Sequence, residues 1–171
     1  SLCYAPTALS PLGGGADDVG PTMKRPITVA SIWYRVYASI RYQELMSRWA
    51  ITWLPPELRG GVPHGGCPDV TMELGLEIEY SLLSDTDLFG AHLDESKAYD
   101  SVARDLPFKT AVRLGLEEDF VDSQRRFYTS LVRYFKIGDT VGPLFGTGLS
   151  ILQGCALSQL WTAITVAGWV W

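Results

Sequence analysis

Asp94 is the carboxylate whose setting best suits a metal ion. It ends a short apolar run, residues 88–94, which contains Gly90 and predicts a short buried strand. A carboxylate at the C-terminal end of such a strand is held rigidly, and carboxylate oxygens are the ligands that hard cations prefer. The alternative is that Asp94 is the N-cap of the segment that follows. The residues alone leave both interpretations open.

Gln153 and Gly154 form the second candidate, directly before an apolar segment over residues 156–170. Glycine lets a backbone approach a base or a sugar closely, and a glutamine amide both donates and accepts hydrogen bonds. This pair could therefore contact a nucleotide. The alternative is a glycine turn that simply begins a buried helix.

Two arginines, Arg25 and Arg35, could hold phosphate, because a guanidinium group binds phosphate through two parallel hydrogen bonds. They belong to a basic stretch, residues 24–48, that has five basic residues and one acidic residue. Residues 69–100 have nine acidic residues and one lysine. A basic stretch followed by an acidic one fits a phosphate-binding surface beside a metal-binding surface. Solvated helix faces would give the same charge pattern. The net charge of −5 argues against nucleic-acid binding by the whole surface.

The composition is that of a folded globular protein, with 47% hydrophobic and 19% charged residues in 171. The three cysteines, Cys3, Cys67 and Cys155, are too far apart to indicate a zinc site or a disulfide framework. A reducing, intracellular compartment is expected, because no secretory signal is visible. The apolar tail, residues 157–171, is shorter than the roughly 18–20 residues of a membrane span and predicts a buried helix.

Local patterns predict most of the remaining elements. Residues 70–82 alternate between apolar and polar, as a strand does, but their length, their Glu and Leu content and Asp69 as a possible N-cap favour a helix. Residues 1–24 and 54–68 are rich in Pro and Gly and predict loops. Further helices are predicted at 31–50, 107–114, 118–134 and 156–170, and a hairpin at 135–145 that turns at 138–139.

Three strings in order carry a resemblance to a known family. They are RPITVASIWYR at 25–35, LDESKAYDSV at 93–102 and QGCALS at 153–158. Together they resemble the fingers and palm of a reverse transcriptase of the non-LTR, LINE-like retrotransposon kind, over about residues 9–171. The resemblance implies an α/β (α+β) fold, mostly helical with a small antiparallel sheet. It also implies one incomplete polymerase domain, made of a fingers-like region at 1–84, a palm segment at 85–115, helices and a hairpin at 116–150 and a palm helix at 151–171.

The same resemblance implies a role for each candidate residue. Asp94 would bind Mg2+ or Mn2+ as the catalytic carboxylate, and Tyr99 would pack beneath the incoming sugar and exclude a 2′-hydroxyl. Arg25 and Arg35 would clamp the triphosphate, while Gln153 and Gly154 would begin the nucleotide-binding helix. Core packing is the alternative for Tyr99, and Asp100 is interpreted as structural.

Two departures from the family pattern stand out. Gln159 follows Ser158 where the family has proline, and the loop at 60–66 lacks the family's arginine. The family's Asp-Asp palm motif and its thumb would lie beyond Trp171, so the chain by itself is expected to be inactive. The expected partners are an RNA template, a DNA primer, deoxynucleoside triphosphates and the remainder of the polymerase domain, with no membrane. A non-catalytic retroelement remnant that binds RNA, an RNA-dependent RNA polymerase and an unrelated α/β domain are the alternatives.

Overall fold

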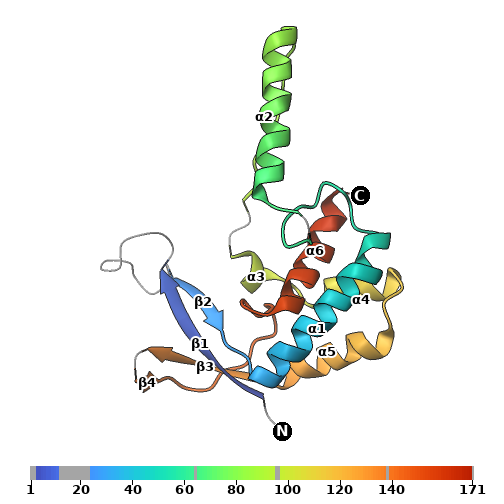
Figure 1. Cartoon of the computed structure of the whole chain (residues 1–171). Helices are drawn as coiled ribbons and strands as arrows, with labels where there is room; N and C mark the ends of the chain where they lie inside the picture. Colours follow the sequence, from blue (N-terminus) through green and yellow to red (C-terminus); the bar gives the residue numbers. More distant parts are fainter. Residues whose placement is uncertain (1–2, 12–23, 64, 95–96, 138, 171) are drawn as a thin grey trace.

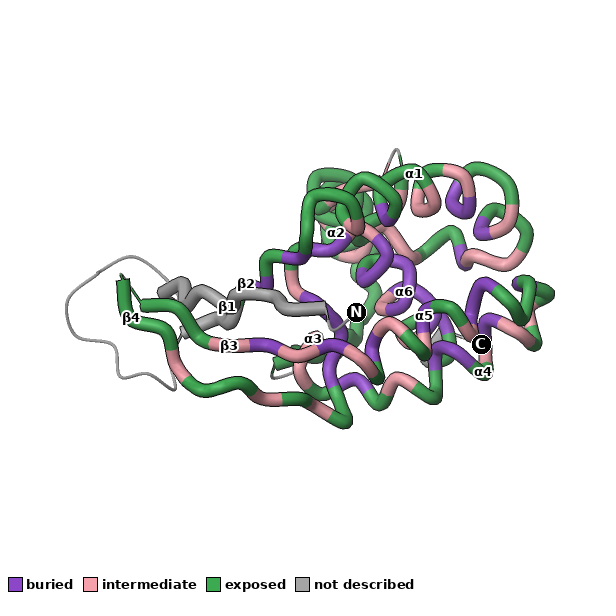
Figure 2. The backbone as a smooth tube through the Cα atoms, turned by 90° about the horizontal axis from the view of Figure 1, so that it is seen from below, coloured by how far each residue is buried: buried purple, intermediate pink, exposed green. Residues whose placement is uncertain are grey.

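The computed structural model describes residues 3–11, 24–63, 65–94, 97–137 and 139–170, with the backbone alone at 3–11, 24–26 and 169–170. A ribbon of strands lies on one side of a cluster of helices, and one long helix projects away from both (Figure 1). The view from below shows the same separation of strands and helices (Figure 2). The fold belongs to the predicted α/β class, mostly helical with a small sheet.

The helical cluster is built around α6 (Ala156–Val170), the helix expected at these residues. Its residues Leu157, Leu160 and Trp161 are fully buried. It packs against α1 (Ile32–Arg48) and α4 (Asp105–Arg113). An apolar helix without charges is stable here because neighbouring elements cover it on most sides.

Aromatic side chains join α6 to its neighbours. The Trp161 ring meets Phe108 of α4 edge-on, with 4.8 Å between ring centroids. It also stacks against Phe120 of α5 (Glu118–Ser130), at 6.2 Å. Burying such large rings stabilises the cluster by several kcal/mol, since replacing a core Phe or Trp by Ala typically costs about 3–5 kcal/mol.

Four strands of the described residues form a sheet in the order β2-β1-β3-β4. They are β1 (Cys3–Pro11), β2 (Lys24–Thr28), β3 (Leu131–Ile137) and β4 (Thr140–Val141). The β1–β2 and β3–β4 pairs are antiparallel, whereas β1 runs parallel to β3. The loop predicted over 1–24 is therefore wrong for residues 3–11, whose backbone groups pair with strands on both sides.

The other helices fit their local signals. The helix α5 ends at Ser130, four residues earlier than predicted, because Leu131 begins the strand that pairs with β1. The hairpin between β3 and β4 is confirmed, with Ile137 paired to Thr140. Two short helices, η2 (Ala50–Thr52) and α3 (Ala98–Ser101), complete the helical elements of the described residues.

The helix α2 (Cys67–Ser84) is confirmed, but its N-cap is Gly66 rather than Asp69. Asp69 lies in the first turn, where its Oδ2 accepts a hydrogen bond from the Gly66 amide at 2.8 Å. Figure 1 shows α2 reaching away from the other helices, and none of its residues, all of which the structure describes, is buried.

The predicted buried strand at 88–94 is wrong. Residues 86–94 adopt no regular structure, and Phe89 and Leu93 are 88% and 77% exposed. A strand needs a neighbouring strand to satisfy its backbone groups. This segment lies in none of the pairings of the four described strands, so its backbone faces solvent.

Candidate functional site

The Gln153–Gly154 turn is hydrogen-bonded to the end of β2. The Thr28 amide donates to the Gln153 carbonyl at 3.2 Å, and the Cys155 amide donates to the Leu152 carbonyl at 3.3 Å. Gly154 has a φ of +101°, which disfavours any residue with a Cβ. A Cβ here would also lie 3.4 Å from the Thr28 carbonyl oxygen. Glycine thus allows the turn to pass close to β2.

A hollow of about 310 Å³ lies between this turn and the first turns of α1. It is lined by Ile32, Arg35, Val36, Ser39, Gly154, Cys155 and Ala156. Ile32 is the first residue of α1 and Ala156 is the first residue of α6, so two helices begin at the same hollow. Helix N-termini carry partial positive charge, and Arg35 adds a full one. The hollow is therefore suited to an anionic group.

The first turn of α1 has a local reason to begin there. Ser31 is its N-cap and accepts a hydrogen bond from the Tyr34 amide at 3.3 Å. A serine cap of this kind typically stabilises a helix by about 1 kcal/mol relative to alanine. Arg35 follows in the first turn, on an exposed position beside the hollow.

Tyr34 connects the hollow's edge to the core. Its ring stacks on Phe127 with 3.8 Å between centroids, and its hydroxyl donates to Gln124 Oε1 at 3.1 Å. The Cys155 thiol lies 3.9 Å from the same hydroxyl. Burial raises the pKa of Tyr34 well above its ordinary value of 10.0, and the neighbouring Cys155 adds to the shift. The Tyr34 hydroxyl is therefore neutral at physiological pH.

Asp100 contacts the amide of Gln153. Gln153 Nε2 donates to Asp100 Oδ2 at 3.4 Å, a long hydrogen bond. Burial raises the pKa of Asp100 above its ordinary value of 3.8, while the positive charges of Arg133 and Lys97 partly oppose that rise. The carboxyl group interpreted as structural from the sequence thus helps to orient a candidate nucleotide-binding side chain.

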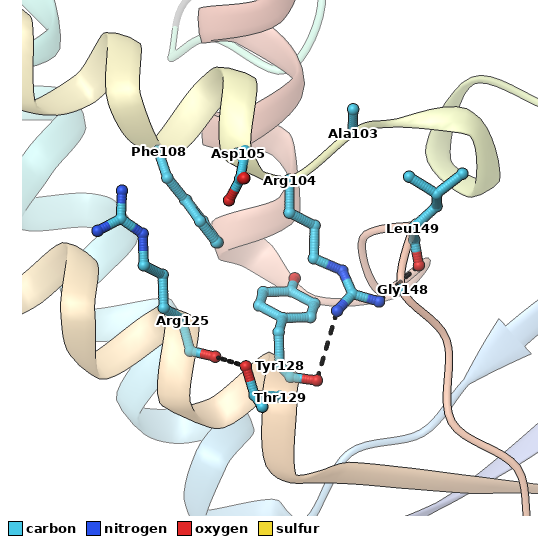
Figure 3. Close-up of a pocket in the computed structure, with 9 residues that line it drawn as sticks. All are labelled: Ala103, Arg104, Asp105, Phe108, Arg125, Tyr128, Thr129, Gly148 and Leu149. Carbon is cyan, nitrogen blue, oxygen red and sulfur yellow. Dashed lines mark hydrogen bonds between the residues drawn. The ribbon is translucent and has the colours of Figure 1, made fainter.

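Arg104 holds the loop that leads into the turn. Its Nε donates to the Ser150 carbonyl at 2.6 Å, and its Nη2 donates to the Thr147 and Leu149 carbonyls, each at 2.5 Å. Arg104 also lies over the Tyr128 ring, at 5.0 Å from its centroid. Figure 3 shows Arg104 beside this ring, among the residues that line a second hollow. The volume of this hollow is about 300 Å³.

Arg133 supports the same loop from β3. Its Nη2 donates to Ser150 Oγ at 2.6 Å and also to Thr147 Oγ1. Burial lowers the pKa of both Arg133 and Arg104, and for Arg104 the nearby charge of Arg133 lowers it further. No local pattern marks either arginine in the sequence, because their shared partner is a loop that only the fold brings near them.

The predicted residues are only partly brought together. Arg35 and Gly154 line one hollow. Tyr99, in α3, packs half-buried against the core, and its carbonyl accepts a hydrogen bond from the Ile151 amide at 2.8 Å. Arg25 lies in β2 opposite Ser10, and its side chain is outside the described part of the structure.

Asp94 is exposed and does not line the hollow. Across the described residues, no group of three His, Cys, Asp or Glu side chains could hold a metal ion. These residues do not by themselves form a metal centre, and metal binding by Asp94 stays a prediction. The described residues also include no helix that is both long and apolar enough to cross a membrane.

Comparison with known proteins gives a partial match. No protein-family model matches the chain. A curated protein matches in part and indicates a retrotransposon-related protein. That relative is the retrovirus-related Pol polyprotein from type-2 retrotransposable element R2DM of Drosophila melanogaster, 33% identical over 104 residues. The match covers 61% of this chain and about a tenth of the relative's length.

Proposed function

We propose that this chain is part of the RNA-directed DNA polymerase of a retrotransposon and that it binds the triphosphate of an incoming deoxynucleotide. The observation that carries the proposal is the shared hollow of Arg35 and Gly154. Arg35 and Gly154 belong to motifs that are distant in sequence, and the chemistry of each motif suits a nucleotide. Both residues line the same hollow. The similarity to a retrotransposon Pol polyprotein supports the same assignment.

The hollow's electrostatics favour a phosphate group. Arg35 can offer two parallel hydrogen bonds to phosphate oxygens. The helices α1 and α6 both begin at the hollow, and helix N-termini attract anions. Gly154 leaves room for a sugar or base to approach the backbone, and Gln153 is beside it with an amide oriented by Asp100. Arg25 of β2 is proposed as the second clamp.

The test is deoxynucleotide binding by the chain itself, measured by anisotropy of a fluorescent deoxynucleoside triphosphate. Arg35→Ala should weaken binding about tenfold or more, since a charge-assisted hydrogen bond is worth about 1.5–3 kcal/mol. Arg48→Ala is the matched control, because it removes the same charge from an exposed position at the other end of α1. Equal affinities for the Arg35 and Arg48 variants would refute the proposed clamp.

Asp94 and Tyr99 are proposed to act in the chemistry of a longer protein. Asp94 would supply a carboxylate for Mg2+ or Mn2+, together with carboxylates from elsewhere in the polymerase. Tyr99 would exclude ribonucleotides by its ring. In such a polymerase, Asp94→Asn should abolish primer extension, and Tyr99→Ala should raise ribonucleotide incorporation. Activity within tenfold of wild type would refute the role of Asp94, and unchanged sugar selectivity would refute that of Tyr99.

The other candidate is a non-catalytic retroelement remnant that keeps only nucleotide or RNA binding. In that case the chain would bind nucleotide or RNA without carrying out primer extension. A primer-extension assay on the chain, with RNA template, DNA primer and magnesium or manganese, should show no extension above the background of Asp94→Asn. Templated extension above that background would show that the chain alone is a polymerase.

A further inference from the structure

The helix α2 exposes more apolar surface than a helix in water normally does. Eight large apolar side chains along it are exposed: Val70, Met72, Leu74, Leu76, Ile78, Tyr80, Leu82 and Leu83. Since none of its residues is buried, α2 contributes almost nothing to the core of its own molecule. A contiguous apolar surface of this kind typically marks an interaction site.

Four of these exposed residues share one side of α2. Met72, Leu76, Tyr80 and Leu83 follow one another at intervals of four, four and three residues, which places them on one helix face. Their exposed fractions run from 58% to 88%. This set is called the α2 stripe below. Its regular spacing is that of a helix packed along another helix.

The charge of α2 limits the choice of partner. The helix has four acidic residues and no basic residue: Asp69, Glu73, Glu77 and Glu79. Glu73 forms an ion pair with Arg59 at 2.9 Å, which offsets only part of this charge. Packing α2 against α2 of a second copy would bring like charges together. A basic partner with an exposed apolar face is favoured.

The outer face of α1 has both properties. Trp33, Tyr37 and Ile40 are spaced four and three residues apart and are 83%, 40% and 60% exposed. This set is called the α1 stripe. The helix is also basic overall, although Arg41 pairs with Glu44 at 2.6 Å and Arg35 lies across the helix beside the hollow, which leaves Arg48 unpaired among the charged residues described in this helix. With 17 and 18 residues, α1 and α2 are both about 25 Å long and could pack along their full lengths.

We propose that the chain forms a reciprocal dimer, in which the α2 stripe of each copy packs on the α1 stripe of the other. Two-fold symmetry allows both contacts at once, so the assembly closes at two copies. Each contact buries apolar residues from both sides and places acidic α2 beside basic α1. The inference is independent of what the hollow binds.

The experiment measures the mass of the chain in solution by sedimentation over a range of concentrations. Wild type should dimerise. Trp33→Glu with Ile40→Glu alters only the α1 stripe, and Leu76→Lys with Tyr80→Lys alters only the α2 stripe. Each double substitution should raise the dimer dissociation constant at least about tenfold, because it places charges in an apolar contact. Circular dichroism should show unchanged helix content, since all four positions are exposed.

A mixture of the two altered proteins provides the sharpest observation. The protein altered in the α1 stripe keeps an intact α2 stripe, and the protein altered in the α2 stripe keeps an intact α1 stripe. These two intact stripes can pack together, so a one-to-one complex should form although neither protein dimerises alone. Leu106→Glu is the matched control, because Leu106 is 57% exposed on α4 and lies in neither stripe. This control should dimerise as wild type does.

Three results would overturn the proposal. If the wild-type chain is monomeric at every concentration, the α2 stripe does not bind a second copy of the chain and its partner is a different molecule. If the protein altered in the α1 stripe dimerises as well as wild type, while the one altered in α2 does not, α2 pairs with itself. If the mixture forms no complex although both altered proteins are folded, the two stripes do not meet.

Discussion

The backbone amide of Thr28 donates a hydrogen bond to the carbonyl of Gln153 over 3.2 Å. This bond joins the last residue of β2 to the turn that precedes α6. Because α1 begins four residues after Thr28, the same bond sets where Arg35 stands relative to Gly154. The candidate nucleotide site thus depends on a backbone contact between two segments far apart in sequence.

Replacing Gly154 should harm both stability and nucleotide binding. Gly154→Ala must place a Cβ at a φ of +101°, and we expect a loss of about 1–2 kcal/mol in the free energy of unfolding. Gly115→Ala is the matched control, since Gly115 has a φ of +84° but a Cβ added there would meet no atom within 4 Å. Urea denaturation should give similar losses for both, whereas only Gly154→Ala should weaken deoxynucleotide binding. Weakened binding in both would attribute the effect to general destabilisation.

Replacing Arg104 should loosen the loop before the turn. Arg104→Lys cannot reproduce the forked contacts to the carbonyls of Thr147, Leu149 and Ser150. We expect a loss of about 2–4 kcal/mol in unfolding free energy. Arg125→Ala is the control, because among the described residues the Arg125 side chain forms a partly exposed ion pair with Asp122 and a distant contact over Phe108. That variant should lose at most about 1 kcal/mol, and an equal loss in both would contradict the anchoring role of Arg104.

Raising the pH above 10 should destabilise the fold through its buried tyrosines. Burial raises the pKa of Tyr128 to about 12, from an ordinary value of 10.0. The unfolded chain therefore ionises first as the pH rises, and stability present below pH 10 is lost between pH 10 and 12. The loss from Tyr128 should be about 2–3 kcal/mol. Denaturation followed with tyrosinate absorbance checks this, and Tyr128→Phe should show a shallower loss.

Asp100 should give a pH dependence of the same origin, burial of an acid, but at acidic pH. Its folded pKa is raised above 3.8, mainly by burial, so the folded state binds the proton more tightly than the unfolded state. The stabilisation by this proton is present below pH 3.8 and is lost as the pH rises through the folded value. Asp100→Asn should remove that contribution. Urea denaturation in a series of buffers from pH 3.8 upward compares the two proteins, and identical slopes against pH would contradict the assignment.

Local chemistry in the sequence was enough to predict several elements. The helices α1, α2 and α6 follow from apolar spacing and composition, and the hairpin between β3 and β4 follows from its turn residues. Arg35 and Gly154 are candidate nucleotide contacts because they lie in strings that resemble reverse-transcriptase motifs, and the chemistry of each residue suits a nucleotide. These features depend on interactions within a few residues of the chain.

Tertiary structure decided what those residues can do together. The shared hollow of Arg35 and Gly154 requires α1 to pack against α6 and β2 to meet the Gln153 carbonyl. The strand β1, the early end of α5 and the absence of a strand at residues 86–94 all depend on which segments are available for pairing. Arg104 likewise acquires its role from carbonyls more than forty residues away. Backbone pairing and side-chain packing between distant segments are long-range interactions, and a local pattern carries no information about the distant partner.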